Sequence, residues 1–390
     1  MANEQAWLRK RKFKPVVLCR RLPNNALKGT RRGASSCFAG IPAARPLARA
    51  FGPTGTINVG IVGVVIRRFI VAVAAICATL ACLMTAARTP EVARIGFVWI
   101  ADPSDIPQAV KEFWERLRVL GWEEGRNLVV ERRSAEGRID RFPALVSDVV
   151  SRNVDVIVTA STPAAIAARN VTRTVPIVAG GMGDPVGAGL AASLARPGGN
   201  LTGLSYGFSD GFAGKWLELL RECAPQLKTI ALVYNPQNPW AVHQRKDLET
   251  TIAPLGLRFH LVEITSPESL KSGFAQLGRQ AQGIIIVADP LTYQMRKEIS
   301  ALAIRQRMPI VASMLEFVDA GALLSYGVDN AAVFRRMAEY VDRVLRGARP
   351  EDLPIEQPTE LMLAVNLKTA AVIGVNVPSH VLNRADMVIR

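Results

Sequence analysis

The chain has 390 residues, 49% of them hydrophobic, and a net charge of +15. Residues 1–68 hold fourteen Lys and Arg against the single acid Glu4, so they carry +13 and residues 88–390 carry only +2. This small charge excludes an electrostatic footprint for nucleic acid on residues 88–390. A basic nucleic-acid arm at the N-terminus is an alternative, but Pro23, Pro42, Pro46 and Pro53 and the lack of a helical apolar period disfavour a recognition helix there.

The first element with a clear pattern is an apolar run behind two arginines. Arg67 and Arg68 precede the uncharged stretch 69–84, "FIVAVAAICATLACLM", and the small residues "TAA" follow it. A basic segment, an apolar segment and small residues form the layout of a secretory signal. We therefore expect residues 67–87 to be a signal peptide.

Two other interpretations of this run stay open, lipid attachment at Cys82 and retention as a membrane anchor. The run is short for an anchor, because a spanning helix needs roughly 20 residues. All three interpretations carry residues 88–390 across a membrane, into the periplasm. We expect residues 1–66 to be a disordered basic leader or a start-site artefact.

The cysteines agree with export. Cys223 is the only one of the five cysteines within residues 88–390. A single thiol provides no intrachain disulfide, no zinc site built on cysteines and no redox pair. These roughly 300 residues bury enough surface to fold without such links, and a chain of this size tends to divide into two domains.

Three apolar strand candidates occur twice, about 130 residues apart, which indicates an internal repeat. Each run is continuous rather than alternating, as in parallel strands that are buried on both faces. Apolar residues at helical spacing follow the first run, with Ser104 or Asp105 as N-cap and Pro107 in the first turn. The pairs are "RIGFVWIADP" (94–103) with "TIALVYNPQNP" (229–239), "DVIVTASTP" (155–163) with "GIIIVADP" (283–290), and "VPIVAGGMGDP" (175–185) with "MPIVASMLEF" (308–317).

Alternating strands and helices predict an α/β fold with two Rossmann-like lobes, each built on a doubly wound parallel sheet. Ligands of such sheets bind beyond the carboxyl ends of the strands. Two lobes that face each other would gather six loops around one cleft: 100–105, 159–164, 180–187, 234–240, 288–293 and 313–318.

The glycine-rich stretch "VAGGMGDPVGAGL" (178–190) is not a nucleotide fingerprint. It follows the third strand rather than the first, Pro185 interrupts it, and it has neither G-x-G-x-x-G spacing nor the Walker lysine. We expect a tight turn that opens a helix, with Asp184 as N-cap and Pro185 at the first helical position. Capping alone and contact with a ligand are both open for Asp184.

In the neighbouring loop "STPAAIAARN", Ser161 or Thr162 is expected to begin a helix that has Pro163 in its first turn. Backbone N–H groups at a helix start attract an anion such as a carboxylate. Ser161 is therefore either a simple cap or a ligand contact.

The second half of the chain supplies amides and acids in the matching loops. Asn235, Asn238, Asp289 and Glu316 lie where an amine or polar tail could dock, and Asp289 occupies the position that Ser161 has in the first half. Five aromatic residues flank the same strand ends, either as packing or as a wall for the ligand: Trp99, Tyr234, Trp240, Tyr293 and Phe317.

No catalytic constellation emerges. His243, His260 and His380 lie in separate segments without metal-ligand spacing, although His243 could reach the mouth of the cleft. Cys223 in "LLRECAPQ" is interpreted as the buried end of a helix. We expect no catalytic residue, no cofactor and no metal, so an enzyme is unsupported.

From about Arg94 to the C-terminus the chain resembles the periplasmic substrate-binding proteins of ABC transporters. It is most similar to the TrpX-type subgroup, which binds tryptophan and other aromatic amino acids. The stretches that carry the resemblance are "AEGRIDRFPALVSDVV", "VDVIVTASTPAAIAA", "GDPVGAGLAASLARPGGNLTGLS", "KWLELLRECAP", "ALVYNPQNP", "EFVDAGALLSYG", "LPIEQPTELMLAVNLKTAAVIGVNVPS" and "LNRADMVI".

The resemblance implies a type I periplasmic-binding fold with a hinge of three segments, near 201–207, near 323–330 and after Pro354. Lobe 1 would comprise 91–203 and 328–350, and lobe 2 would comprise 204–327 and 351–390.

The resemblance also implies a ligand site with two ends. A carboxylate would contact Ser161, Thr162, Gly183 and Asp184, and an amine or other polar end would contact Asn235, Asp289 and Glu316. The loop "VWIADPSD" departs from the Ser/Gly-rich loop of many relatives, so an amino acid and another organic acid both stay open as ligand.

These observations together predict a receptor that captures a small anionic or zwitterionic solute by hinge closure. Its partner would be an ABC permease in the inner membrane, it would bind no nucleic acid, and it would be a monomer or a weak dimer. An effector-sensing domain of a regulator or sensor kinase, and an enzyme that uses the same cleft, are the alternatives.

Overall fold

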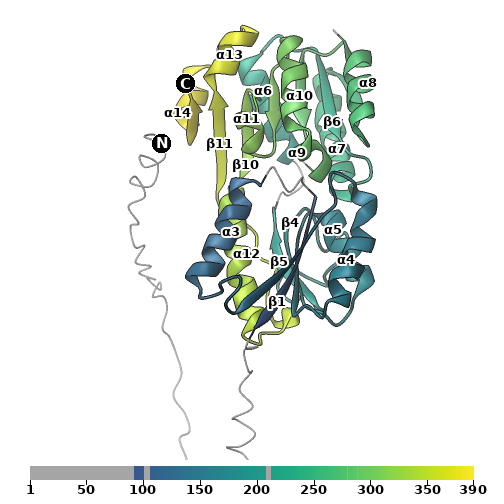
Figure 1. The fold of residues 1–390 in the computed structure, drawn as a ribbon. Coiled ribbons are helices and arrows are strands. Elements are labelled where there is room, and N and C mark those ends of the chain that lie inside the picture. The colour runs from purple at the N-terminus through teal and green to yellow at the C-terminus, as the bar shows by residue number, and fades with distance from the viewer. Residues whose placement is uncertain (1–91, 101–105, 208–211, 279, 288) are drawn as a thin grey trace, which may run out of the picture. The chain divides into compact units, whose positions relative to one another are not determined.

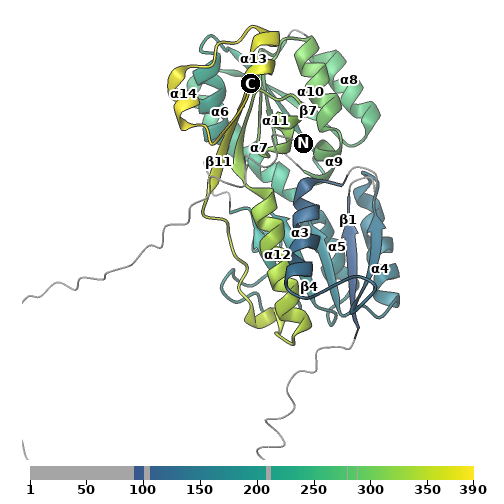
Figure 2. The same ribbon diagram turned by 60° about the vertical axis from the view of Figure 1, so that its left-hand side comes forward.

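The computed structural model describes two α/β lobes, each with its own sheet (Figures 1 and 2). The predicted leader 1–66, the predicted signal 67–87 and the predicted N-caps Ser104 and Asp105 lie outside the described residues. The described residues are 92–100, 106–207, 212–278, 280–287 and 289–390.

The first lobe is built on five parallel strands in the order β2-β1-β3-β4-β5. Three of them, β1, β3 and β4, are the apolar runs that the sequence predicts, and their residues are almost all buried. The bounds are β1 Ala93–Trp99, β2 Leu128–Ser134, β3 Val156–Ala160, β4 Ile177–Met182 and β5 Leu201–Ser205.

Helices cover both faces of this sheet, because alternate strand residues point to opposite sides. Val156 and Val158 pack with residues of α3 and α12, whereas Ile157 between them packs with residues of α4 and α5. Figure 2 shows α12 lying beside α3, although more than 200 residues separate them in the chain. The bounds are α3 Gln108–Val119, η1 Ile139–Arg141, α4 Phe142–Ser151, α5 Thr162–Val171 and α12 Asn330–Leu345.

The second lobe is built on seven strands in the order β12-β11-β10-β9-β8-β6-β7. The bounds of the strands are β6 Thr229–Tyr234, β7 Arg258–Glu263, β8 Gly283–Ile286, β9 Ile310–Ala312, β10 Leu324–Val328, β11 Leu361–Asn366 and β12 Met387–Ile389. Its helices are α6 Phe212–Cys223, α7 Pro239–Ile252, η2 Ala253–Leu255, α8 Pro267–Leu277, α9 Pro290–Gln294, α10 Arg296–Arg305, α11 Glu316–Asp319, α13 Leu367–Ile373 and α14 Ser379–Arg384. Among the helices of the described ranges, none has both the length and the apolar character of a membrane span.

The topology confirms the internal repeat. The order β2-β1-β3-β4-β5 in the first sheet corresponds to β7-β6-β8-β9-β10 in the second, so β1, β3 and β4 match β6, β8 and β9. The second sheet departs from the expected parallel arrangement at one place, where β11 runs antiparallel to β10. The reason is that β11 enters this sheet from the first lobe instead of through a helical crossover.

Two local helix predictions needed correction. The helix after β1 exists as α3, but Pro107 is its N-cap residue and not part of its first turn. The helix predicted after Asp184 is absent, because the described residues 184–200 form turns and bends only. The Asp184 carboxylate accepts hydrogen bonds from the N–H groups of Val186 and Gly187 at 3.1 and 2.8 Å, and Gly189 then adopts a left-handed φ of 69° that ends the turn.

The chain passes between the lobes three times: after β5, between β10 and α12, and between η3 (Pro350–Asp352) and β11. The third passage pairs with the first, since the Ser205 N–H donates to the Glu356 carbonyl and the Glu356 N–H donates to the Gly203 carbonyl. These bonds, at 2.9 and 3.0 Å, tie two hinge segments together at the edge of the first sheet.

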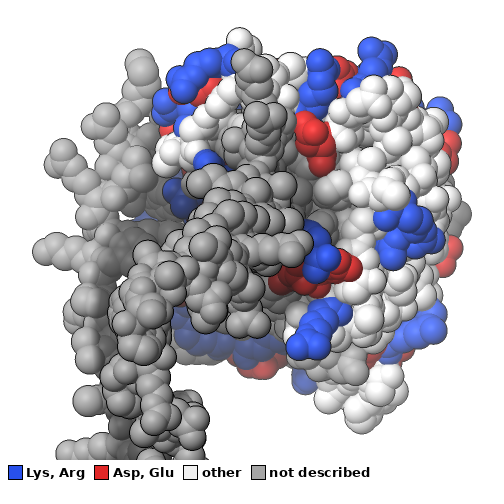
Figure 3. Space-filling model, turned by 90° about the horizontal axis from the view of Figure 1, so that it is seen from below, with Lys and Arg blue, Asp and Glu red and all other residues white. Residues whose placement is uncertain are grey.

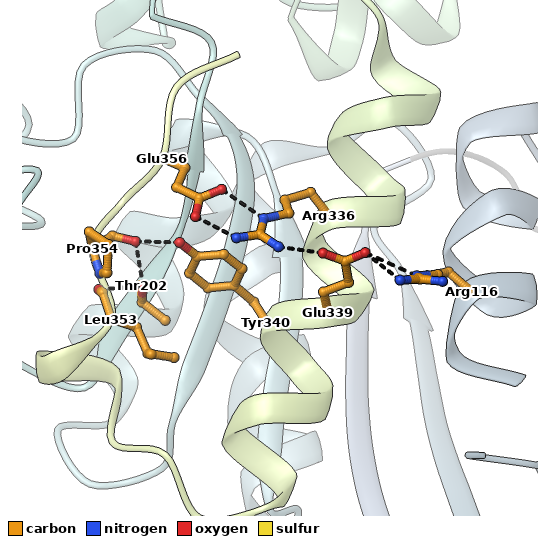
Figure 4. Close-up of polar contacts among 8 residues, drawn as sticks. All are labelled: Arg116, Thr202, Arg336, Glu339, Tyr340, Leu353, Pro354 and Glu356. Carbon is orange, nitrogen blue, oxygen red and sulfur yellow. Dashed lines mark hydrogen bonds and ion pairs between the residues drawn. The ribbon is translucent and has the colours of Figure 1, made fainter. Parts of the chain in front are cut away.

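A polar network fixes the third passage to α12 and α3 (Figure 4). Arg336 of α12 donates two hydrogen bonds to the Glu356 carboxylate at 2.6 and 2.7 Å and also pairs with Glu339. Glu339 accepts in turn from Arg116 of α3 at 2.7 Å. The guanidinium of Arg336 lowers the pKa of Glu356, so this carboxylate is charged at neutral pH. A bidentate arginine pair positions its partner more precisely than a single hydrogen bond.

The close approach of β4 and β5 generates a prediction about Gly203. This residue has a φ of 136°, and a Cβ built on it would lie 1.9 Å from the Ala179 carbonyl oxygen. We expect Gly203→Ala to lower the free energy of unfolding by about 3 kcal/mol or more, because the two strands must separate. Gly189→Ala is the control, since its Cβ would meet open space and only its left-handed φ adds a cost of about 1–2 kcal/mol. Urea titrations of both variants check this, and equal losses would contradict it.

Candidate functional site

The strand ends of both lobes line one cavity, whose empty space is about 730 Å³ with open solvent at its mouth included. Lobe 1 contributes the end of β1, the start of α3 and the start of α5. Lobe 2 contributes the starts of α7, α9 and α11. Tyr206, in the first passage between the lobes, and Asn330 and Phe334, at the start of α12, complete the lining. A ligand in this cavity would therefore touch both lobes and the hinge.

Aromatic and apolar side chains form most of the wall. Trp99, Trp240, Tyr293 and Phe334 face the cavity, and Ile100, Val110 and Met314 lie among them. Gly183 makes room for one of these rings, because a Cβ built on it would lie 2.3 Å from the Trp240 indole. A wall of this kind accepts the ring of an organic ligand and excludes water from it.

The start of α5 forms a polar part of the wall. Ser161 is its N-cap with a strained φ of 93°, and its hydroxyl accepts from the Ala164 N–H at 3.5 Å, which is a long contact. Thr162 is buried and accepts from the Gly183 N–H at 3.0 Å. Because Pro163 has no N–H, the backbone donors of this first turn are Thr162 and Ala164. Together with the Ser161 hydroxyl they suit an anionic oxygen.

Asp289 faces the same cavity from the other lobe. One carboxylate oxygen accepts from the Thr292 N–H at 2.8 Å, and the Thr292 hydroxyl accepts from the Asp289 N–H at 2.8 Å. The other oxygen, Oδ2, is buried and has no hydrogen-bond partner among the described residues, and Asp289 is only 4% exposed. Burial raises the pKa of Asp289 to about 6, against the opposing effect of the nearby polar groups of Thr292 and Asn235. An unpaired buried carboxylate suits a cationic ligand group.

A chain of hydrogen bonds crosses the cavity wall from the hinge to lobe 2. The Tyr206 hydroxyl donates to Asn330 Oδ1 at 3.1 Å, and Asn330 Nδ2 donates to Glu316 Oε1 at 3.0 Å. Burial raises the pKa of Glu316, although Asn330 lowers it. Burial also raises the pKa of Tyr206, so its hydroxyl keeps its proton at neutral pH.

The structure brings five of the eight predicted site residues to this cavity and leaves three outside it. Gly183 lies behind Trp240, and Asp184 lines a second pocket with His243, which adjoins the cavity at Thr162 and Trp240. Asn235 is fully buried and accepts from the Gln237 N–H at 2.9 Å. The five that line the cavity are Ser161, Thr162, Asn238, Asp289 and Glu316, and their roles in ligand binding stay predictions.

Tyr206, Asn330 and Phe334 line the cavity without having been predicted as site residues. Tyr206 and Asn330 lie in "LTGLSYG" and "LLSYGVDN", which the resemblance assigns to hinge segments. Of the predicted aromatic residues, Trp99, Trp240 and Tyr293 line the cavity. Tyr234 donates to Glu263 instead, and Phe317 is fully buried in the core.

The other reactive side chains of the described residues take structural positions. Cys223 is buried at the end of α6, as predicted, and burial raises its pKa to about 12. The ring of His243 stacks on Trp240 with centroids 6.0 Å apart. Within the described ranges no three His, Cys, Asp or Glu residues gather as metal ligands.

Charges are mixed on the face of the molecule seen in Figure 3. Over the visible part, Lys and Arg side chains are interspersed with Asp and Glu among neutral residues. Several of the acidic and basic residues of lobe 1 pair with each other, for example Arg138 with Asp140 and Arg349 with Asp352. A mixed surface of this kind produces no strong field of one sign.

Comparisons with known proteins point to one family. The family described as ABC transporter substrate binding protein matches residues 95–389. A curated relative from Clostridioides difficile, named Tyrosine-binding protein, is 28% identical over 275 residues, which are 70% of this chain and 79% of the relative.

Solved structures share the fold. A conserved domain protein from Vibrio cholerae has a TM-score of 0.71 and 28% identity, over 76% of this chain and 100% of that chain. A Streptococcus pneumoniae ABC domain in complex with L-Trp has a TM-score of 0.69 and 24% identity over the same shares. A ligand-free, open substrate-binding protein from Clostridioides difficile has a TM-score of 0.54 and 26% identity, over 76% and 99%.

The raised pKa of Asp289 generates a prediction for the ligand-free protein. Since this pKa, about 6, lies above that of an aspartate in the unfolded chain, the fold is stabilised by protonation. That stability is present below pH 4 and is lost as the pH rises through 6. Asp289→Asn keeps a capping oxygen without the charge. Between pH 4 and pH 7 we expect wild type to lose up to about 3 kcal/mol of unfolding free energy relative to Asp289→Asn. Urea titrations at both pH values test this, and a difference that does not change with pH would contradict it.

Proposed function

The chain belongs to the ABC transporter substrate-binding protein family, and we propose that it captures an amino acid with an aromatic side chain for import through an ABC permease. The family agrees with the resemblance that the sequence stretches carry. Two of the relatives are named as binding proteins, which favours a receptor over an enzyme with the same cleft. The receptor would act in the periplasm, where the predicted signal would deliver it.

One observation carries the choice of ligand: the cavity has an anion-binding helix start in one lobe and an unpaired buried carboxylate in the other. The ligand carboxylate would dock on the first turn of α5, at Ser161 and Thr162. The ligand ammonium would pair with Asp289 Oδ2, which has no hydrogen-bond partner within the described part of the chain. An α-amino acid carries both charges on adjacent groups, so one small molecule would satisfy both ends.

The rest of the wall favours an aromatic side chain. Trp99, Trp240, Tyr293 and Phe334 surround the space with rings. Aromatic pairs contribute about 0.5–1.5 kcal/mol beyond the area they bury, so a ring is held better than a short aliphatic chain. The curated relative named Tyrosine-binding protein supports the same ligand class.

Binding would close the hinge. A ligand that contacts both lobes stabilises the state in which they approach, by its difference in affinity for the open and closed states. We propose lobes of 91–203 with 328–350 and of 204–327 with 351–390. The placement of β1–β5 and α12 in one sheet assembly and of β6–β12 in the other supports this division. The permease would recognise the paired lobe surfaces of the closed state.

The ligand assignment predicts the outcome of a calorimetric titration with the amino acids and with organic acids that lack an amine. At least one aromatic amino acid should bind saturably. Asp289→Asn should weaken this binding by about 10- to 100-fold, since a hydrogen bond to a charged group contributes about 1.5–3 kcal/mol. Ser161→Ala should weaken it by roughly tenfold for the same reason.

The matched control for this titration is Asp184→Asn, which also replaces a carboxylate with an amide. Asp184 does not line the cavity, and an asparagine can still cap its turn. Its affinity should equal that of wild type. If only organic acids without an amine bind, or if Asp184→Asn weakens binding as much as Asp289→Asn does, the ligand assignment is wrong.

Hinge closure predicts a change of shape in solution. Saturating ligand should reduce the radius of gyration of wild type, measured by small-angle X-ray scattering. At the same ligand concentration Asp289→Asn should keep a larger average radius, because less of it is liganded. An unchanged radius in saturated wild type would show that the ligand binds without closure.

A further inference from the structure

The cavity has more acidic side chains than the single ammonium group of an amino acid can pair with. Among the described residues that line it, Asp289 and Glu316 are acidic and none is Lys or Arg. The charge of Arg296 lowers the pKa of Glu316 and of Asp319, while its guanidinium donates to the Tyr293 carbonyl at 3.0 Å and lies over the Tyr293 ring. The ammonium of the ligand proposed above pairs with Asp289. Glu316 is then left facing the ligand as a second acceptor.

The hydrogen bonds from Tyr206 through Asn330 to Glu316 determine whether Glu316 acts as a donor or as an acceptor. Tyr206 keeps its hydroxyl proton and donates it to Asn330 Oδ1, so the amide nitrogen of Asn330 must face Glu316. Nδ2 donates to both carboxylate oxygens, at 3.0 and 3.3 Å. Both hydrogen bonds of this series are thus donated in the direction of Glu316. Both oxygens of Glu316 accept from Asn330, and in its ionised form the carboxylate, with about four acceptor positions, has further acceptor positions for the cavity and no donor.

Asn330 and Tyr206 hold this acceptor from outside lobe 2. Tyr206 follows β5 in the first passage between the lobes, and Asn330 begins α12 just after the second passage. Glu316 belongs to α11 of lobe 2. The three residues therefore connect the acceptor to both hinge passages, and Asn330 is the positioning residue between them.

We propose that Glu316, positioned by Asn330, accepts a hydrogen bond from a donor on the ligand's ring, and that the receptor thereby selects aromatic amino acids that carry such a donor. A phenol O–H and an indole N–H both meet this requirement, whereas a plain phenyl ring supplies no donor to the acceptor positions of Glu316 that Asn330 leaves open. A site built around a ligand's hydrogen bond rejects the analogue that lacks it, because the buried group is then unpaired. This inference rests on the amino-acid ligand proposed above.

The test compares tyrosine, tryptophan and phenylalanine on wild type and variants by calorimetric titration. Wild type should bind tyrosine or tryptophan at least about 100-fold more tightly than phenylalanine. Glu316→Leu, which cannot accept, should reduce this ratio to below about tenfold, mainly by improving phenylalanine. Glu316→Gln keeps one acceptor and should retain an intermediate ratio. Asn330→Ala leaves Glu316 in place without its support and should also reduce the ratio.

The matched control is Asp289→Asn, which should weaken tyrosine and phenylalanine equally and leave their ratio unchanged. Circular dichroism and thermal unfolding confirm that each variant is folded, and the wild-type ratio needs no variant at all. Equal affinity of wild type for all three amino acids would overturn the inference and leave the proposed function standing. Equal weakening of all three in Glu316→Leu would overturn it as well, because Glu316 would then hold the ammonium. Failure of wild type to bind any amino acid would overturn the proposed function and this inference together.

Discussion

The parallel pairing of strands is the constraint on which the rest of this structure depends. Parallel strands need a crossover between them, so every strand ends at the same edge and every following loop starts there. The repeat builds this arrangement twice, with matching order from β2 to β5 and from β7 to β10. The loops after β3 and β8 therefore place Ser161 and Asp289 on opposite walls of one cavity. A hydroxyl at a helix start in one lobe and a carboxylate at the equivalent position in the other give the cavity two chemically different ends.

The hinge is more than a connection between these halves. Its third passage pairs with the first through Glu356, and Arg336 ties it to α12. The same helix, α12, begins at Asn330 and carries Phe334, which both face the cavity. A ligand that shifts Asn330 or Phe334 also acts on α12. The next turn of this helix carries Arg336, which binds the third hinge passage at Glu356. In the proposed hinge closure, α12 would therefore connect the ligand to the third passage, in addition to the contact of both lobes with the ligand.

The sequence predicted the parts of the fold that continuous apolar runs encode. Buried strands such as β1 and β6 stand out because both of their faces lie under helices. β2 and β7 were not predicted, since as edge strands they are partly exposed and carry charged residues such as Arg132 and Arg258. The prediction of a helix after Asp184 was wrong, because local glycines and capping hydrogen bonds favour turns there. Antiparallel β11 could not be predicted either, because its direction depends on how the chain returns from the other lobe.

The residues of the site also divide into those that the sequence predicts and those that it does not. Residues that follow a predicted strand directly, such as Ser161 and Asp289, could be placed in the cavity from the sequence, because strand ends converge whatever the details of packing. Tyr206 and Asn330 could not, since their positions depend on where the hinge passages cross between two sheets. Asn235 directly follows β6 and yet lies fully buried beside Asp289, where it lowers the pKa of the carboxyl that burial raises. Proximity to a strand end therefore identifies the neighbourhood of a site, and only the packing decides which side chain faces the ligand and which one tunes its neighbour.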